Sequence, residues 1–174
     1  MATVGKAAQR RAAHAVLKAM LPDTLAGHST AVCERVAASE VFRGSGALSV
    51  YLAKRCGEVK TDALIARCFA DGKRVFVPKV TGSGRHDMVM VEVRTAEELA
   101  DFPCNSWGIP EPPDVDARAH CTHADHAVDL VVVPGVAFSE GCHRLGHGKG
   151  YYDTFFATVA ESYAAAGKPF PTLL

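Results

Sequence analysis

One segment of the chain combines closely spaced glycines with basic side chains and a carboxylate. Its residues are Arg144, Leu145, Gly146, His147, Gly148, Lys149, Gly150, Tyr151, Tyr152 and Asp153. Glycine at alternate positions lets successive backbone N–H groups approach a phosphate, and a helix that starts there adds a favourable dipole. Arg144 and Lys149 supply compensating positive charge. The pattern predicts a binding site for an oligophosphate.

This glycine-rich segment matches neither of the two common phosphate-binding motifs. Gly148-Lys149 is followed by Gly150, whereas a Walker A loop has the Ser or Thr that holds magnesium at this position. The third glycine also comes one residue too early for the Gly-x-Gly-x-x-Gly pattern of dinucleotide-binding proteins. Asp153 is the candidate magnesium ligand, since magnesium usually takes one or two carboxylates together with phosphate oxygens. A turn that uses glycine only for tight packing between a strand and a helix is the alternative.

Composition limits the partners that the chain can have. Its 174 residues are 48% hydrophobic, and 19 Lys and Arg balance 19 Asp and Glu. Without a global positive field we expect neither nucleic acid nor a membrane as a partner, so a phosphate must be bound by a local site. No apolar run reaches the length of a membrane span. We expect a cytoplasmic protein, with a mitochondrial location left open, that is a monomer or a weak homodimer.

The cysteines and histidines form no standard metal or redox motif. The six cysteines contain no Cys-x-x-Cys pair, which excludes a zinc ribbon and a thioredoxin motif. His120, Cys121, His123 and His126 lie within seven residues. Because their spacing matches no standard zinc site, we expect a solvated loop there rather than a metal centre.

The pattern of apolar residues predicts a single α/β domain over residues 1–174. Helical spacing predicts helices at about 6–20, 24–39, 61–69, 95–102 and 153–166, with Thr61 and Thr95 as N-caps. Short β-branched runs predict strands at 47–52, 74–77, 88–93 and 129–134, the second ended by Pro78. Strands separated by helices favour a three-layer fold, with a mainly parallel sheet and helices on both faces. The glycine-rich segment then follows the carboxyl end of a strand, where such sheets bind ligands.

Short patterns in the same order as in a known family extend over the whole chain. They are Lys6-x-x-x-Arg10, Glu58-Val59-x-Thr61, Trp107-x-Ile109-Pro110-x-Pro112, and Val133-Pro134-Gly135-Val136-Ala137-Phe138 followed by Gly141 and the glycine-rich segment. With these patterns the chain closely resembles the 5-formyltetrahydrofolate cyclo-ligases, also called methenyltetrahydrofolate synthetases. The resemblance implies a fold similar to that of sugar-phosphate isomerases and deaminases.

The resemblance also implies a reaction. It is the MgATP-dependent conversion of 5-formyltetrahydrofolate into 5,10-methenyltetrahydrofolate, with release of ADP and phosphate. In the family's mechanism the formyl oxygen attacks the γ-phosphate, N10 of the folate closes on the activated carbon, and phosphate leaves. Such a site mainly needs positioning and charge neutralisation, and no general base is required because the attacking oxygen carries no proton.

Roles for individual residues follow from the same resemblance. Catalysis is expected of Lys149 and Arg144, and Mg²⁺ binding of Asp153. ATP binding is expected of Lys6, Arg10, Arg144, Gly146, His147, Gly148, Lys149, Gly150, Tyr151 and Tyr152. Folate binding is expected of Arg10, Leu52, Glu58, Trp107, His147, Gly148, Lys149, Gly150, Tyr151 and Tyr152. The alternatives are core packing for Tyr151 and Trp107, a solvated loop for Glu58, and a solvated helix face for Lys6 and Arg10.

The chain also departs from the family pattern. Ser139 stands where Asp is usual and Lys60 where an acidic or amide residue is common. Residues 172–174 resemble the opening of another strand, so we expect the family's remaining strand and its second acidic magnesium ligand to lie beyond Leu174.

Two other classes of function stay open. A sugar-phosphate isomerase or deaminase on the same fold would need a catalytic carboxylate and histidine pair and no ATP. A non-catalytic nucleotide or folate binder would bind its ligand without turnover.

Overall fold

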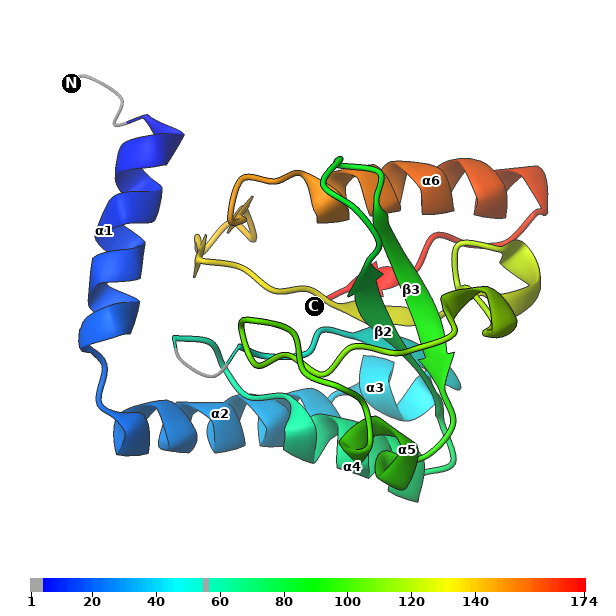
Figure 1. Ribbon diagram of the computed structural model, residues 1–174, viewed down its shortest axis with the longest axis horizontal. Coiled ribbons are helices and arrows are strands. Elements are labelled where there is room, and N and C mark those ends of the chain that lie inside the picture. Colours follow the sequence, from blue (N-terminus) through cyan, green and yellow to red (C-terminus); the bar gives the residue numbers. More distant parts are fainter. Residues whose placement is uncertain (1–4, 55–56) are drawn as a thin grey trace.

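A five-stranded sheet of order β3-β2-β1-β4-β7 runs through the molecule (Figure 1). The computed structural model describes residues 5–54 and 57–174. The strands are β1 (Ala47–Val50), β2 (Arg74–Val80), β3 (Met88–Val93), β4 (Leu130–Val132) and β7 (Thr172–Leu173). β1 pairs in parallel with β2 and with β4, and β4 with β7, whereas β3 pairs antiparallel with β2. The predicted mainly parallel sheet is confirmed.

Helices cover both faces of this sheet (Figure 1). The α-helices of the described residues are α1 (Lys6–Ala19), α2 (Pro22–Ala37), α3 (Glu40–Gly44), α4 (Asp62–Ala70), α5 (Ala96–Ala100) and α6 (Tyr151–Ala165), and all but α1 pack within these layers. On one face, Leu48 and Val50 of β1 belong to a core that includes Phe42 of α3 and side chains of α2 and α4. On the other face, Phe76 of β2 belongs to a second core with Phe155 of α6. Alternate residues of β1, β2 and β4 therefore contribute to two cores, one on each face of the sheet, as the predicted three-layer fold requires.

The helix α1 stands beside these layers rather than within them (Figure 1). None of its residues is buried. Its Arg10 Nε donates a hydrogen bond to the Gly146 carbonyl at 2.8 Å. The ring of His14 lies 5.3 Å, centroid to centroid, from that of His147. The helix is thus joined by polar contacts to the segment that precedes α6.

The strand β2 continues through Pro78 to Val80, so the prediction that Pro78 ends this strand is wrong. Arg74 donates its N–H to the Gly46 carbonyl on the β1 side of the strand. Pro78, four residues later, directs its nitrogen to the same side. Because the pairing with β1 stops at Phe76, the missing N–H of Pro78 costs the sheet no hydrogen bond to β1. As a result, β2 extends four residues beyond its last pairing with β1, past the carboxyl end of that strand.

The two predicted N-caps behave differently. The Thr95 hydroxyl accepts from the Glu98 N–H at 3.1 Å and caps α5 as predicted. Thr61 occupies the N-cap position of α4, but its hydroxyl donates to the Tyr51 carbonyl at 2.7 Å. The prediction of a side-chain cap at Thr61 is therefore wrong. The Thr61 hydroxyl instead ties the start of α4 to the end of β1.

Several short elements were not predicted, among them one helix and two strands. The helix α3 has five residues and is capped by Ser39, whose hydroxyl accepts from the Phe42 N–H. The strands β5 (Ala137–Phe138) and β6 (Arg144–Leu145) form an antiparallel hairpin outside the main sheet. These three elements are too short to show a hydrophobic period.

The segment before β4 is partly buried, which contradicts the prediction of a solvated loop. Cys121 is fully buried in the core beside α6, and its N–H donates to the Met90 carbonyl at 3.1 Å. Over residues 5–54 and 57–174 no group of three or more His, Cys, Asp and Glu side chains is placed to hold a metal ion. No helix in these ranges is both long enough and apolar enough to cross a membrane.

Replacing Tyr163 by Phe is expected to lower the free energy of unfolding by about 1–3 kcal/mol. The Tyr163 hydroxyl, on the buried face of α6, donates to the Cys121 carbonyl at 2.6 Å and accepts from the Val128 N–H at 2.9 Å. Its removal leaves two buried backbone groups without this partner. Urea unfolding at neutral pH measures the change.

The matched control is Thr158→Val on the same helix, which removes an exposed hydroxyl bonded to the Thr154 carbonyl. It should change the free energy of unfolding by less than about 0.5 kcal/mol. Equal effects of the two substitutions would contradict the assignment.

Candidate functional site

A cleft of about 790 Å³ lies at the carboxyl ends of the parallel strands β1, β2 and β4. Its walls come from α1, the loop after β1, the end of β2, the loop around Trp107, and the chain from Pro134 into α6. Parallel strands end at the same edge of a sheet, and ligands of α/β proteins bind outside that edge. The volume is within the usual range for small-molecule sites.

All the residues that the sequence predicts to bind ATP, folate or metal line this one cleft. They are Lys6, Arg10, Leu52, Glu58, Trp107, Arg144, Gly146, His147, Gly148, Lys149, Gly150, Tyr151, Tyr152 and Asp153. They come from segments far apart in the chain, so the fold alone brings them together. Which ligand each residue touches stays a prediction.

Left-handed backbone explains two of the glycines. Gly148 has φ +102° and Gly150 has φ +80°, a region that side chains with a Cβ rarely enter. A Cβ added at Gly146, Gly148 or Gly150 would lie against the side chain of Arg144, Arg10 or Arg85, respectively. None of these contacts is with a strand of the main sheet, which disfavours the alternative that the glycines serve strand-to-helix packing. They leave room in the cleft beside Arg10 and Arg144.

The glycines lead directly into a helix. α6 begins at Tyr151, two residues before the predicted start at Asp153, with Gly150 as its N-cap. The N–H groups of the first helical turn have no partner within a helix. They are therefore available to an anion at this edge of the cleft, together with the dipole of a 15-residue helix.

Arg144 joins the end of β4 to the start of α6. Its Nη1 donates to the Pro134 carbonyl at 3.2 Å, and its Nη2 donates to Asp153 Oδ1 at 2.9 Å. The guanidinium carbon also lies 5.7 Å from the centroid of the Tyr152 ring. The Asp153 side chain is 78% exposed and the Arg144 side chain 20%. Arg144 is thus held in place, whereas Lys149 is exposed and pairs with no other described residue.

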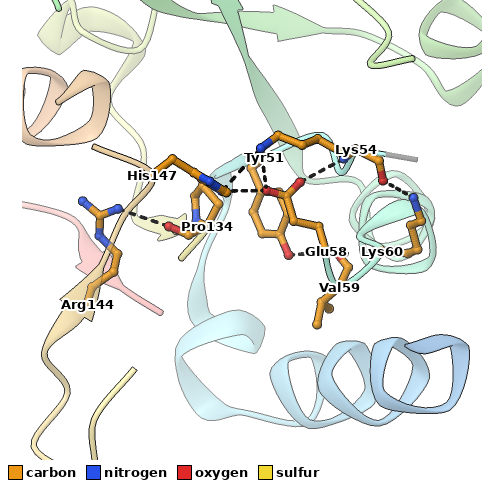
Figure 2. A network of polar contacts seen from close by, with 8 residues as sticks. All are labelled: Tyr51, Lys54, Glu58, Val59, Lys60, Pro134, Arg144 and His147. Atoms are coloured by element: carbon orange, nitrogen blue, oxygen red, sulfur yellow. Dashed lines mark hydrogen bonds and ion pairs between the residues drawn. The ribbon is translucent and has the colours of Figure 1, made fainter. Parts of the chain in front are cut away.

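Glu58 and His147 connect the two loops that border the cleft (Figure 2). His147 Nε2 lies 3.1 Å from Glu58 Oε1, while Glu58 Oε2 accepts from the Lys54 N–H at 2.9 Å. The Lys54 ammonium is 3.7 Å from the same carboxylate. The Glu58 side chain is only 11% exposed, so the alternative of a solvated loop carboxylate is wrong.

The environment of Glu58 keeps it ionised. Burial by itself would raise the pKa of this carboxyl group, but the hydrogen bonds from His147 and from the Lys54 N–H outweigh burial and hold the pKa below its ordinary value. The loop that carries Glu58 is fixed by further bonds. The Tyr51 hydroxyl donates to the Val59 carbonyl at 2.8 Å, and the Lys60 ammonium donates to the Lys54 carbonyl (Figure 2).

Apolar and aromatic side chains form the rest of the lining. Leu52 is 7% exposed, whereas Trp107 is 66% exposed, which excludes core packing as the reason for this tryptophan. Tyr152 packs against both cores, and its hydroxyl is buried without a hydrogen-bond partner among the described residues. Burial raises the pKa of this hydroxyl, so it stays a proton donor. An unpaired buried donor is costly unless a ligand or water completes it.

Several lining residues were missed by the sequence analysis. They are Tyr51, Lys54, Pro78, Val80, Gly82, Ser83, Met88, Ile109, Pro134 and Leu145. Those from Pro78 to Met88 belong to the end of β2, the turn that follows it and the first residue of β3. Because we expected β2 to end at Pro78, nothing in the pattern placed this turn beside the glycine-rich segment.

Comparison with known proteins identifies the family. The chain matches the 5-formyltetrahydrofolate cyclo-ligase family over residues 2–173. A Caenorhabditis elegans protein named "Probable 5-formyltetrahydrofolate cyclo-ligase" is 43% identical over 129 residues, which cover 74% of this chain and 61% of the relative. The mouse 5-formyltetrahydrofolate cyclo-ligase is 33% identical over 145 residues, which cover 83% of this chain and 70% of the relative. The match thus spans about three fifths of the length of the worm protein.

Solved structures agree. The NMR structure of 5,10-methenyltetrahydrofolate synthetase from Aquifex aeolicus superposes with a TM-score of 0.69 at 26% identity, covering 88% of this chain and 72% of that one. A 5,10-methenyltetrahydrofolate synthetase from Mycoplasma pneumoniae gives a TM-score of 0.63 at 18% identity, over 88% of this chain and 78% of the other, and shows the shared fold. The chain belongs to the 5-formyltetrahydrofolate cyclo-ligase family, which confirms the resemblance found in the sequence.

Protonation of Glu58 is expected to weaken the fold in acid. Because its pKa in the folded protein is below the ordinary value of 4.5, the ionised group stabilises the fold above that pH, and the contribution is lost as pH falls through the folded pKa. The difference in unfolding free energy between the wild type and Glu58→Gln should therefore be largest near neutral pH and shrink below about pH 4.5. Urea unfolding at a series of pH values measures it, and a difference independent of pH would contradict the role of the charge.

Proposed function

We propose that this chain is an ATP-dependent 5-formyltetrahydrofolate cyclo-ligase. It would convert 5-formyltetrahydrofolate and MgATP into 5,10-methenyltetrahydrofolate, ADP and phosphate. One observation carries the proposal: a single cleft combines a glycine-rich, basic helix start with a largely buried carboxylate near aromatic side chains. The first suits a polyphosphate and the second a flat heterocycle with N–H groups. Membership of the family supports the same conclusion.

ATP would bind by its phosphates at the glycine-rich segment. Gly148 and Gly150 leave room for the phosphates, and the first turn of α6 offers N–H donors. Positive charge would come from Lys6 and Arg10 on α1 and from Lys149. Since α1 is joined to this segment by the hydrogen bond between Arg10 and Gly146, its charges are already held next to the glycines.

The folate would occupy the aromatic part of the cleft. Leu52 and Trp107 offer apolar surfaces on which a pterin or benzoyl ring can pack. Glu58 is ionised, so it can accept hydrogen bonds from pterin N–H groups. The buried Tyr152 hydroxyl, which lacks a partner among the described residues, could donate to an oxygen of the substrate.

The reaction would proceed in two steps. The formyl oxygen attacks the γ-phosphorus, a new P–O bond forms, and the bond to the β-phosphate oxygen breaks with release of ADP. N10 then attacks the activated carbon, loses its proton, and phosphate leaves with the former formyl oxygen. Lys149 and Arg144 would stabilise the negative charge on the transferred group, which is the main requirement of phosphoryl transfer.

Magnesium would bind together with the nucleotide at Asp153. This carboxylate is exposed and has one oxygen engaged by Arg144. One carboxylate with phosphate oxygens is a usual donor set for Mg²⁺, and a cluster of three acidic or histidine ligands is absent from the described residues. When bound, the ion neutralises phosphate charge and favours the departure of ADP.

One observation favours a second candidate. Glu58 and His147 form a carboxylate and histidine pair in the cleft, which a sugar-phosphate isomerase or deaminase would require. Such an enzyme would turn over a sugar phosphate without ATP. The apolar lining and the membership of the ligase family favour the cyclo-ligase.

The proposal extends to the setting in which the enzyme works. We place it in the cytoplasm, because none of the cysteines that the structure describes is in a disulfide, as is usual in a reducing compartment. We propose a monomer or a weak homodimer. A related cyclo-ligase from Arabidopsis thaliana is named as mitochondrial, so that location stays open for this chain.

Mixing the protein with 5-formyltetrahydrofolate and MgATP should raise the near-ultraviolet absorbance of methenyltetrahydrofolate, and omitting ATP should abolish the rise. Lys149→Ala is expected to lower kcat/KM by about 100-fold, because a charge that stabilises the transferred phosphoryl group is lost. The matched control is Lys168→Ala, an exposed lysine beyond α6, which should change the rate by less than about twofold.

Three outcomes would contradict the proposal. A product that forms without ATP excludes the cyclo-ligase reaction, and turnover of a sugar phosphate without ATP favours the isomerase. Binding of ATP and folate without any turnover identifies a non-catalytic binder.

Asp153→Asn is expected to raise the Mg²⁺ concentration needed for half-maximal activity by about tenfold, since the amide is a weaker ligand than the carboxylate. The KM for 5-formyltetrahydrofolate should stay nearly unchanged. Asp125→Asn, which alters an exposed carboxylate outside the cleft, is the control. An unaltered Mg²⁺ requirement in Asp153→Asn would rule out Asp153 as the ligand.

A further inference from the structure

The loop that carries Trp107 is organised by a single side chain, that of Asn105. Asn105 Oδ1 accepts hydrogen bonds from the N–H groups of Trp107, at 2.9 Å, and of Ile109, at 3.1 Å. Its backbone N–H donates to the Ile109 carbonyl at 2.9 Å, and its carbonyl accepts from the Gly108 N–H at 2.9 Å. Gly108 has φ +71°, which closes the turn. Both the amide and the backbone of Asn105 therefore hold the turn from 105 to 109.

A charged pair attaches this turn to the central sheet. Asn105 Nδ2 donates to Glu111 Oε1 at 2.9 Å, and Lys79 Nζ donates to Glu111 Oε2 at 2.5 Å. Lys79 belongs to β2, next to Pro78 and Val80, which themselves line the cleft. The side chains of Lys79 and Glu111 are only 22% and 24% exposed, so solvent screens their attraction less than that of a fully exposed pair. Each oxygen of Glu111 thus has its own partner.

Packing does not fix Trp107. The tryptophan lines the cleft with Ile109 but is 66% exposed, so few neighbours restrain its ring. Its backbone, however, is restrained by the bonds to Asn105. A surface that must order itself on binding loses affinity, whereas one that is already ordered does not. The hydrogen bonds to Asn105 therefore fix the position of Trp107, whereas a buried aromatic residue is fixed by packing.

We propose that Asn105, Glu111 and Lys79 are positioning residues that hold Trp107 and Ile109 as a preformed wall for the flat ring of the substrate. The proposal rests on the cyclo-ligase function proposed above. The proposal predicts different effects on folate binding and on ATP binding, because the network contacts neither the glycine-rich segment nor Asp153. Its loss should weaken binding of the folate while leaving ATP binding and the phosphoryl transfer step almost unchanged.

The chain permits a test in which the hydrogen bonds are first broken and then restored. Asn105→Asp places two carboxylates face to face, which removes the donor to Glu111 and adds repulsion. The double variant Asn105→Asp with Glu111→Gln exchanges amide and carboxylate. The amide nitrogen at position 111 then donates to position 105, its oxygen accepts from Lys79, and the total charge is unchanged. Every hydrogen bond of the network is available again.

The KM for 5-formyltetrahydrofolate should rise about tenfold in Asn105→Asp and return to within about threefold of the wild-type value in the double variant. The KM for ATP and kcat should change by less than about twofold in both. Glu92→Gln is the matched control, because it breaks an ion pair with Arg74 on the same sheet and Glu92 has the same 24% exposure. A KM that does not rise, a KM for ATP that rises equally, or a double variant that fails to recover would overturn the proposal.

Fluorescence tests the same proposal without substrate. Trp107 is the only tryptophan of the chain, so its emission anisotropy reports this turn alone. Anisotropy should fall in Asn105→Asp and in Lys79→Met and recover in the double variant. Unchanged anisotropy would overturn the positioning role whatever the activity. A wild-type protein without cyclo-ligase turnover, but with this anisotropy pattern, would instead contradict only the proposed function and the assignment of the wall to folate.

Discussion

The parallel pairing of β1 with β4 is the constraint on which the site depends. Leu48 pairs with Leu130 and Val50 with Val132, so both strands end at the same edge of the sheet. The loops that follow them therefore begin side by side. The contact between Glu58 and His147, which are 89 residues apart, joins these loops across the cleft. Without this register, the Glu58 carboxylate and the glycine-rich segment would not be brought into contact.

The fold was largely predictable because its cores follow simple periods. The strand at β4 is buried at every position, as a central parallel strand requires, and α6 buries one face. The failures have equally physical causes. The hairpin of β5 and β6 is built from residues that are not buried, among them Phe138 at 58% exposure, so hydrophobic periodicity carries no signal for it. The hydroxyl of Thr61 donates to the Tyr51 carbonyl and accepts from no N–H of α4, because tertiary structure sets this contact.

The candidate site was predictable by residue type but not by geometry. Lys6 and Arg10 lie four residues apart on α1, and their spacing alone favours a solvated helix face. In the structure Arg10 is half-buried and hydrogen-bonded to Gly146, and both side chains line the cleft. Lys79 and Glu111 carry no signature at all, because an ion pair between distant segments leaves no pattern in the sequence. Such contacts decide the shape of the cleft, and only the fold shows them.

In the proposed reaction, one cleft holds the formyl oxygen of the folate against the γ-phosphate of ATP. The most direct measurement uses 5-formyltetrahydrofolate whose formyl oxygen is a heavy isotope, followed by mass spectrometry of the phosphate released in a single turnover. We expect one labelled oxygen in each phosphate, formed together with methenyltetrahydrofolate. Unlabelled phosphate would contradict it, because the formyl oxygen would then never have been joined to phosphorus.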